Sequence, residues 1–293
     1  MSVVAPPAVR AGVAALRWRP RHLLERAAVH AILVVYAAIA LGPILLVIVN
    51  SLKARQAIFD APVALPTPET FSLVGYETLA RRAHFETYFA NSAIVTLGSL
   101  AAVLLIGSMA AFALSEYRFR GNRWIGLYLA LGIMIPIRLG TVSLLQLFVR
   151  IGLVNNLLAL ILVYTAQALP ITVFILGAFM REVPGELKDA ARVDGASEYR
   201  IYRLVVPLVR PALSVIATFT IIPIWNDLWW PIILAPSRET STITLGAQQF
   251  LGQFVSDFNA VLAALTLAMI PVLALYFVFS RQLIRGVLGG AIK

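Results

Sequence analysis

The chain has 293 residues, of which 60% are hydrophobic and only 13% are charged, and its formal net charge is +10. Soluble domains do not have this composition, which is typical of integral membrane proteins. Cysteine is absent from the sequence, which excludes disulfides, thiolate catalysis, iron–sulfur clusters and cysteine zinc sites.

Six stretches of the sequence approach or exceed the roughly 20 apolar residues that are needed to cross a bilayer. We therefore predict an all-α, polytopic membrane bundle of six transmembrane helices over residues 27–283, between tails 1–26 and 284–293. The first apolar run, Ala27–Val49, is longer than the h-region of a signal peptide, so it is expected to be a retained helix. The predicted spans are 27–50, 88–115, 124–148, 157–180, 212–235 and 260–280.

Basic residues indicate how the helices are oriented, because Lys and Arg are retained on the cytoplasmic side. If both termini are cytoplasmic, most of the 24 basic residues fall in inner segments. We therefore expect a multi-pass protein of the cell (inner) membrane with both ends inside. Loops 51–87 and 236–259 are then outside and the charged segment 181–211 is inside. The net charge is explained by topology and contact with membrane lipid, so no nucleic-acid partner is expected.

The sequence offers little for catalysis. The three histidines have no metal-ligand spacing, no G-x-S-x-G motif occurs, and none of the three lysines follows a glycine as a P-loop requires. We expect no catalytic residue, no metal and no cofactor in this chain, which cannot hydrolyse ATP through a P-loop.

Two ionisable residues lie deep within predicted spans, Arg138 and Asp227. They are roughly 22 and 26 Å from the inner ends of their helices, at 1.5 Å per residue. Our hypothesis is that they pair or face one polar cavity, because an unpaired charge at that depth costs several kcal/mol. Alternatively, Pro136 and Pro231 break the two helices and both charges reach water at the outer surface.

The charged segment 181–211 predicts two short helices joined by a turn. Gly195 can adopt the left-handed conformation that ends a helix, and Ser197 can cap the next one. Apolar residues repeat at helical spacing in the second helix, and Pro207 and Pro211 mark its junction with the fifth span. Taken alone, this pattern also fits an amphipathic helix pair on the bilayer surface.

The stretch LKDAARVDGASEYRIYRLVVPLVRPAL closely resembles the EAA loop of ABC importer permeases, in the carbohydrate-uptake group related to the smaller maltose-permease subunit. The segment WNDLWW and the ending RGVLGGAIK are also similar to that group. Asp189 stands where the family usually has Glu. The residues that match the loop are Asp189, Ala190, Ala191, Asp194, Gly195, Ala196, Ser197, Pro207, Leu208 and Pro211.

The resemblance implies a type I ABC importer permease fold and the import of a sugar or oligosaccharide. It also implies that segment 181–211 docks on a cytoplasmic ATPase present in two copies, which binds ATP and Mg. Further implied partners are a second homologous permease and an extracytoplasmic solute-binding protein.

Candidate pathway residues are Arg138, Trp225, Asn226 and Asp227, and the candidates that face the binding protein are Gln248, Gln249 and Gln253. The alternative function is a self-sufficient, ion-coupled carrier that uses Arg138 and Asp227 and needs no ATPase.

Overall fold

The computed structural model describes residues 20–82, 84–251 and 257–291. These residues are mostly helical and include an isolated bridge between Lys53 and Phe71, which confirms the all-α prediction. The chain divides into two units, Met1–Leu46 and Val47–Lys293. The described part of the first unit is residues 20–46 of α1 (Pro20–Ser51), and the other helices belong to the second unit.

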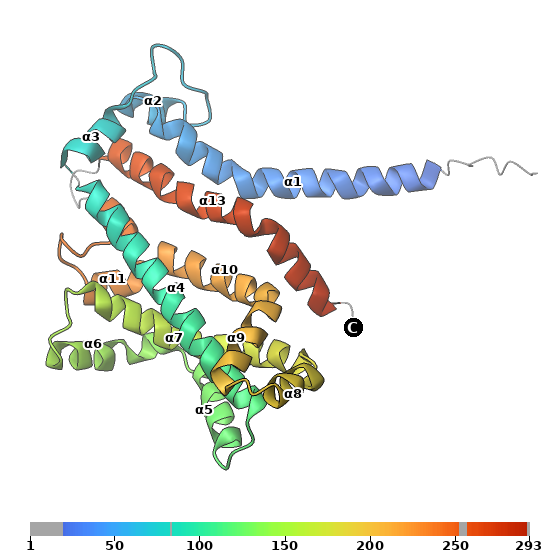
Figure 1. Ribbon diagram of the computed structural model, residues 1–293. Helices are drawn as coiled ribbons and strands as arrows, with labels where there is room; N and C mark the ends of the chain where they lie inside the picture. Colours follow the sequence, from blue (N-terminus) through green and yellow to red (C-terminus); the bar gives the residue numbers. More distant parts are fainter. Residues whose placement is uncertain (1–19, 83, 252–256, 292–293) are drawn as a thin grey trace, which may run out of the picture. The chain divides into compact units, whose positions relative to one another are not determined.

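In the second unit, α4 and α7 form the most extensive helix pair, and α10 packs against α4, α7 and α13 (Figure 1). Gly107 allows α4 and α7 to approach closely, because a Cβ at Gly107 would lie 2.5 Å from Cγ2 of Thr172. The helices are α2 (Arg55–Asp60), α3 (Val74–Arg82), α4 (Phe85–Glu116), α5 (Asn122–Met134), η1 (Ile137–Gly140), α6 (Thr141–Arg150), α7 (Leu157–Glu182), α8 (Gly185–Val193), α9 (Glu198–Leu208), α10 (Arg210–Asn226), α11 (Trp229–Leu234), α12 (Ile243–Gln248) and α13 (Phe258–Ala291).

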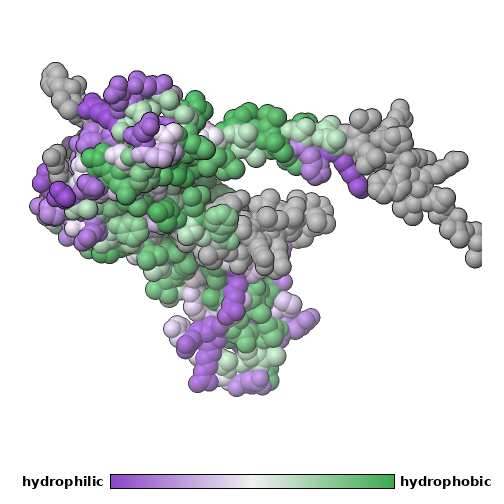
Figure 2. Space-filling model, turned by 90° about the horizontal axis from the view of Figure 1, so that it is seen from above, coloured by the Kyte–Doolittle hydropathy of each residue, from purple (hydrophilic) through white to green (hydrophobic). Residues whose placement is uncertain are grey.

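Among the described residues, three helices are long and apolar enough to cross a membrane: Glu25–Ser51 of α1, α4 and α7. The number rises to five if two bent pairs, Asn122–Met134 with Ile137–Arg150 and Glu198–Leu208 with Arg210–Asn226, each count as one span. The apolar part of α13 over residues 258–274 is shorter than these spans. Figure 2 shows apolar side chains over much of the surface in that view, as expected for a protein in contact with lipid.

Two predicted spans are interrupted, and the alternative that placed a break at Pro136 is confirmed, whereas the fifth span does not break at Pro231. The third span bends by 88° after Met134, because Pro136 has no amide hydrogen to continue the helix. The fifth ends at Asn226 and resumes at Trp229, whereas Pro231 lies within α11. At the other end of the unit, α13 continues to Ala291, so most of the predicted tail 284–293 is helical.

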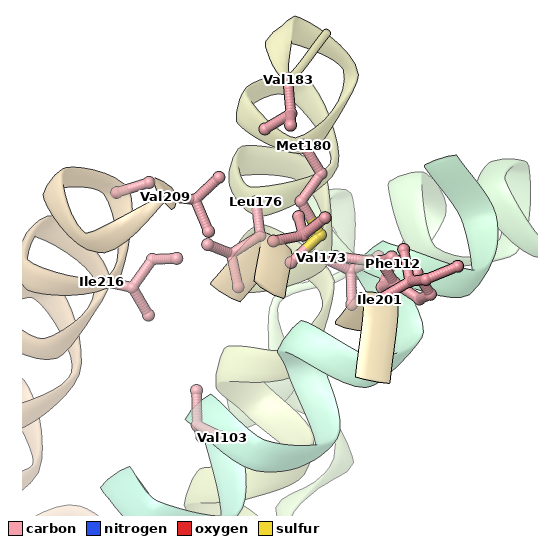
Figure 3. Close-up of a cluster of buried hydrophobic side chains, with 12 residues drawn as sticks. Val103, Phe112, Val173, Leu176, Met180, Val183, Ile201, Val209 and Ile216 are labelled. Atoms are coloured by element: carbon pink, nitrogen blue, oxygen red, sulfur yellow. The ribbon is translucent and has the colours of Figure 1, made fainter. Parts of the chain in front are cut away.

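Buried apolar side chains hold α4, α7, α9 and α10 together. In Figure 3, Phe112 of α4, Val173 of α7 and Ile201 of α9 point toward one another. Val205 of α9 and Ile216 of α10 belong to the same cluster. The short helix α9 is therefore part of the core of the membrane helices, and a movement of α9 must be transmitted to them.

The predicted outer loop 51–87 is more ordered than its polar sequence suggests, since it contains α2 and α3. Lys53 is only 1% exposed, and its Nζ donates to Oδ1 of Asn50 at 3.1 Å and to the carbonyl of Ala61 at 2.8 Å. Nδ2 of Asn259 donates to the Lys53 carbonyl at 2.7 Å. Lys53 thus connects the end of α1, the outer loop and the start of α13.

Replacing Lys53 by Met is expected to lower the free energy of unfolding by about 1–3 kcal/mol, because buried acceptors lose their donor. The measurement is the thermal unfolding midpoint of the detergent-solubilised protein. Arg55→Met is the matched control, since Arg55 is two residues away and exposed. Equal midpoints for the two variants would contradict the assigned role of Lys53.

Candidate functional site

The turn between α8 and α9 has the geometry predicted for Gly195. The φ angle of Gly195 is +78°, in the left-handed region. The Ala196 amide donates to the Ala191 carbonyl at 2.9 Å, and the Gly195 amide donates to the Arg192 carbonyl at 3.0 Å. This pair of bonds is a Schellman motif. A Cβ at Gly195 would meet no atom within 4 Å, so glycine is required here by backbone conformation alone.

The ends of α9 differ in detail from the prediction. Ser197 occupies the N-cap position with extended backbone, but its side chain makes no capping hydrogen bond. Pro207 lies in the last turn of α9, and Pro211 lies in the first turn of α10. The two helices meet at 74°, so segment 181–211 forms a rigid, bent connection into α10.

Helices α8 and α9 form an elbow with its turn at Gly195. Its two arms expose different surfaces. α9 buries Ile201 and Val205, and its Tyr202 hydroxyl is 2.8 Å from Oγ of Ser108 on α4. In contrast, α8 has no buried residue, and its Leu187 and Val193 are exposed, Val193 by 88%. The elbow is therefore fixed to the core through α9 and presents Leu187 and Val193 of α8 outward.

A carboxylate at the end of α4 connects both arms of the elbow. The Glu116 side chain is only 9% exposed and accepts from Nζ of Lys188 at 2.5 Å and from Nη2 of Arg192 at 2.7 Å. Arg192 also contacts Oε1 of Glu198 on α9 through Nε at 3.0 Å. One buried acid and one arginine thus join α4, α8 and α9.

Tyr117 completes this network, because its hydroxyl donates to Oε2 of Glu198 at 2.7 Å. Burial and this hydrogen bond raise the pKa of Tyr117 to about 12. The hydrogen bond from Arg192 is the main cause that lowers the pKa of Glu198, followed by the one from Tyr117. Glu198 therefore stays ionised, and Tyr117 stays protonated, near neutral pH.

Asp189, which replaces the family's usual Glu, lies at the edge of the network. Its side chain is 72% exposed, and its Oδ1 accepts from Nη1 of Arg192 at 2.9 Å within the same helix. Sequence reasoning missed Glu116, Lys188 and Arg192. The four-residue spacing of Lys188 and Arg192, which places both cations on one face of α8, could have singled out these two, but no local signal pointed to Glu116.

A cavity of about 440 Å³ lies between α7 and α10. Of the four predicted pathway residues, Arg138, Asn226 and Asp227 line it. Trp225 does not: its buried indole donates from Nε1 to the Ala268 carbonyl at 3.0 Å, and it packs edge-on against Phe89. Trp225 instead joins α10 to α13.

The two deep charges lie close together in this cavity. Nη2 of Arg138 is 3.9 Å from Oδ1 of Asp227, at the limit of an ion pair, and the Arg138 side chain is 66% exposed. Asp227 has closer partners: its Oδ2 accepts from the Tyr164 hydroxyl at 2.8 Å and from the Trp230 amide at 3.1 Å. Asp227 therefore fixes the break between α10 and α11, and an ion pair of this length with a largely exposed arginine contributes little.

The predicted outer-loop glutamines are placed in part. Gln248 ends α12 and is exposed. Gln249 accepts from the Tyr88 hydroxyl at 3.2 Å and donates to Oγ of Ser241 at 3.3 Å, so it helps to hold this loop against α4. Gln253 lies outside the described residues.

Comparison with known proteins agrees with this architecture. Residues 103–289 match the family described as binding-protein-dependent transport system inner membrane component. The chain is 32% identical to the diacetylchitobiose uptake system permease protein NgcG of Streptomyces coelicolor, over 90% of this chain and 88% of the relative. It is 30% identical to the arabinooligosaccharides transport system permease protein AraQ of Halalkalibacterium halodurans, over 88% and 92%.

The fold is shared with a bacterial ABC transporter involved in the import of alginate. The TM-score is 0.77 at 21% identity, covering 90% of this chain and 98% of that one. Family membership sets aside the alternative of a self-sufficient ion-coupled carrier. The chain belongs to the binding-protein-dependent transport system inner membrane components, and it is a multi-pass permease subunit of an ABC importer.

Proposed function

We propose that this permease imports a sugar or an oligosaccharide. The observation that carries the proposal is the similarity to permeases named for saccharides, which include diacetylchitobiose, arabinooligosaccharides and melibiose/raffinose/stachyose. The cavity between α7 and α10 is compatible with such a substrate. It offers the amides of Gln167 and Asn226 and the hydroxyl of Tyr164, groups that can hydrogen-bond sugar hydroxyls.

The elbow is proposed to be the surface on which the ATPase acts. The exposed apolar side chains of α8 supply a contact, and the Glu116 network and the buried face of α9 connect that contact to α4, α7 and α10. Closure of the ATPase would then move these helices as a body. ATP and Mg would be bound by the ATPase, and this chain would bind no cofactor and catalyse no reaction.

The proposed assembly has two ATPase subunits, a second homologous permease and an extracytoplasmic solute-binding protein. Both termini of this chain would be cytoplasmic, because the elbow and most basic residues then lie on the ATPase side. The opposite loop, 236–259, would face the binding protein and present Gln248 to it.

Reconstitution tests this proposal. The permease, purified with the subunits that accompany it, is placed in liposomes with its binding protein, and uptake of radiolabelled saccharides is measured with and without ATP inside. ATP-dependent uptake of a saccharide is expected. Uptake of an amino acid or of a metal ion, but of no saccharide, would overturn the substrate class.

Gly195→Val is expected to uncouple ATP hydrolysis from uptake, because a side chain at positive φ costs roughly 1–2 kcal/mol and shifts the turn. Gly195→Asn is the matched control, since Asn tolerates this conformation better. The measurement is the number of solute molecules taken up per ATP hydrolysed. If Val and Asn behave alike, backbone conformation at Gly195 does not control coupling.

Glu116→Gln is expected to reduce uptake strongly, because it leaves the cations of Lys188 and Arg192 without their shared counter-charge. Removing one partner of a shielded ion pair is destabilising, because it leaves the other charge uncompensated. Asp189→Asn should have a much smaller effect, since Asp189 is exposed and contacts only Arg192 among the described ion pairs. Uptake rates and retention of the ATPase during purification are compared. A larger effect of Asp189→Asn would indicate that Asp189 makes the key contact with the ATPase.

Asp227→Ala is expected to impair both stability and uptake, because the Tyr164 hydroxyl and two amides at the start of α11 lose their acceptor. Arg138→Gln should lower uptake less and leave the unfolding midpoint unchanged. The double reversal Arg138→Asp with Asp227→Arg should not recover uptake, since Arg cannot accept these hydrogen bonds. Recovery by the double reversal would show that the ion pair dominates.

A further inference from the structure

Three cavities with shared lining residues succeed one another along α5 and α7. The first, of about 770 Å³, lies at the loop between α4 and α5. The second, of about 130 Å³, shares Leu114, Asn122 and Arg181 with the first. The third, of about 790 Å³, shares Leu129 and Pro170 with the second. We call the three together the α5–α7 groove.

The mouth of the groove is strongly basic. Arg118, Arg120, Arg123 and Arg181 all line the first cavity, and all four are exposed. Among the described ion pairs none involves these four arginines. The neighbouring acid, Glu116, is already neutralised by the cations of the elbow. The mouth therefore holds an uncompensated positive charge.

The loop that carries Arg118 and Arg120 is held in shape. Nδ2 of Asn122 donates to the Leu114 carbonyl at 3.1 Å and to the Tyr117 carbonyl at 2.6 Å, which closes the turn between α4 and α5. Asn122 is also the first residue of α5, whose free amides add to the positive potential at the mouth.

Beyond the mouth, the walls of the groove are apolar. Leu129 of α5 and Val173 and Phe174 of α7 line the second cavity. The space beside Gly126 is open, because a Cβ at Gly126 would meet no atom within 4 Å. The groove narrows again at Gly132, where a Cβ would lie 3.0 Å from Cγ of Pro170. The space thus has a charged end and an apolar length that follows two membrane helices.

We propose that the α5–α7 groove binds one anionic phospholipid, with its phosphate among the four arginines and an acyl chain between α5 and α7. A guanidinium group can donate two parallel hydrogen bonds to phosphate oxygens. Basic pockets between transmembrane helices bind anionic lipid headgroups. Free phosphate would use only the mouth, and so would an acidic protein surface. The apolar continuation past Gly126 favours a lipid. This inference goes beyond the proposed function and does not depend on the solute carried.

The test measures phosphatidylglycerol that remains bound to the intact permease complex. The complex is exchanged into nanodiscs of phosphatidylcholine with 30 mol% (about one lipid in three) deuterated phosphatidylglycerol, extracted into detergent, and analysed by native mass spectrometry. Two variants probe the two parts of the groove. Arg118→Gln/Arg120→Gln/Arg123→Gln removes charge from the mouth, and Gly126→Leu fills the apolar part.

Each variant has a matched control. Arg55→Gln/Arg81→Gln/Arg150→Gln removes the same charge from exposed positions elsewhere. Gly42→Leu adds the same side chain to another open helical glycine. We expect the triple mouth variant to weaken phosphatidylglycerol retention by roughly fivefold for each arginine removed, Gly126→Leu to lower it clearly, and both controls to match the natural sequence. If the triple variant does not elute as an intact complex, Arg123→Gln alone replaces it.

Several results would overturn the proposal. Equal retention of phosphatidylcholine and phosphatidylglycerol would remove the role of the charge. Unchanged retention in Gly126→Leu would remove the role of the apolar groove, and so would displacement of the lipid by inorganic phosphate. Loss of the ATPase subunit from the triple variant, with lipid retention unchanged, would show that the arginines contact protein instead.

Discussion

The rest of this structure depends on the ion pairs that the Glu116 carboxylate makes with Lys188 and Arg192. A carboxylate that is only 9% exposed needs an opposite charge close by, and Lys188 and Arg192 supply it from another helix. Because α8 supplies both cations and Arg192 also reaches Glu198, the elbow cannot change its angle to α4 without separating these charges. The contact therefore makes the elbow a rigid extension of the membrane helices.

This rigidity matters for the turn at Gly195, which joins α8 to α9. The exposed arm α8 can receive a force only if the opposite arm does not yield, and α9 is anchored by Ile201 and Val205 in the same cluster as Phe112 and Ile216. Apolar packing fixes the position of α9, while the ion pairs fix the angle of α8. A partner that moves α8 must then move α4, α7 and α10 together.

Polar groups are also paired where the helices break. Each break in a membrane helix exposes backbone amides and carbonyls that need partners. At the end of α10, the carboxylate of Asp227 accepts from the amides of Trp229 and Trp230 and from the hydroxyl of Tyr164. A charge that the sequence suggested as an ion-pair partner is thus first a cap for α11, and Arg138 lies at the edge of this arrangement. Asp227 also lines the cavity between α7 and α10.

The sequence by itself determined the class of protein, the approximate place of each membrane stretch, and the turn at Gly195, because hydropathy and left-handed backbone are local properties of the chain. It also located the family through the residues around that turn. Only the tertiary structure decided that Glu116 and not Asp189 anchors the elbow, that Trp225 packs against α13, and that Lys53 is buried. These outcomes depend on which side chains meet across helices distant in sequence, and no local pattern specifies such meetings.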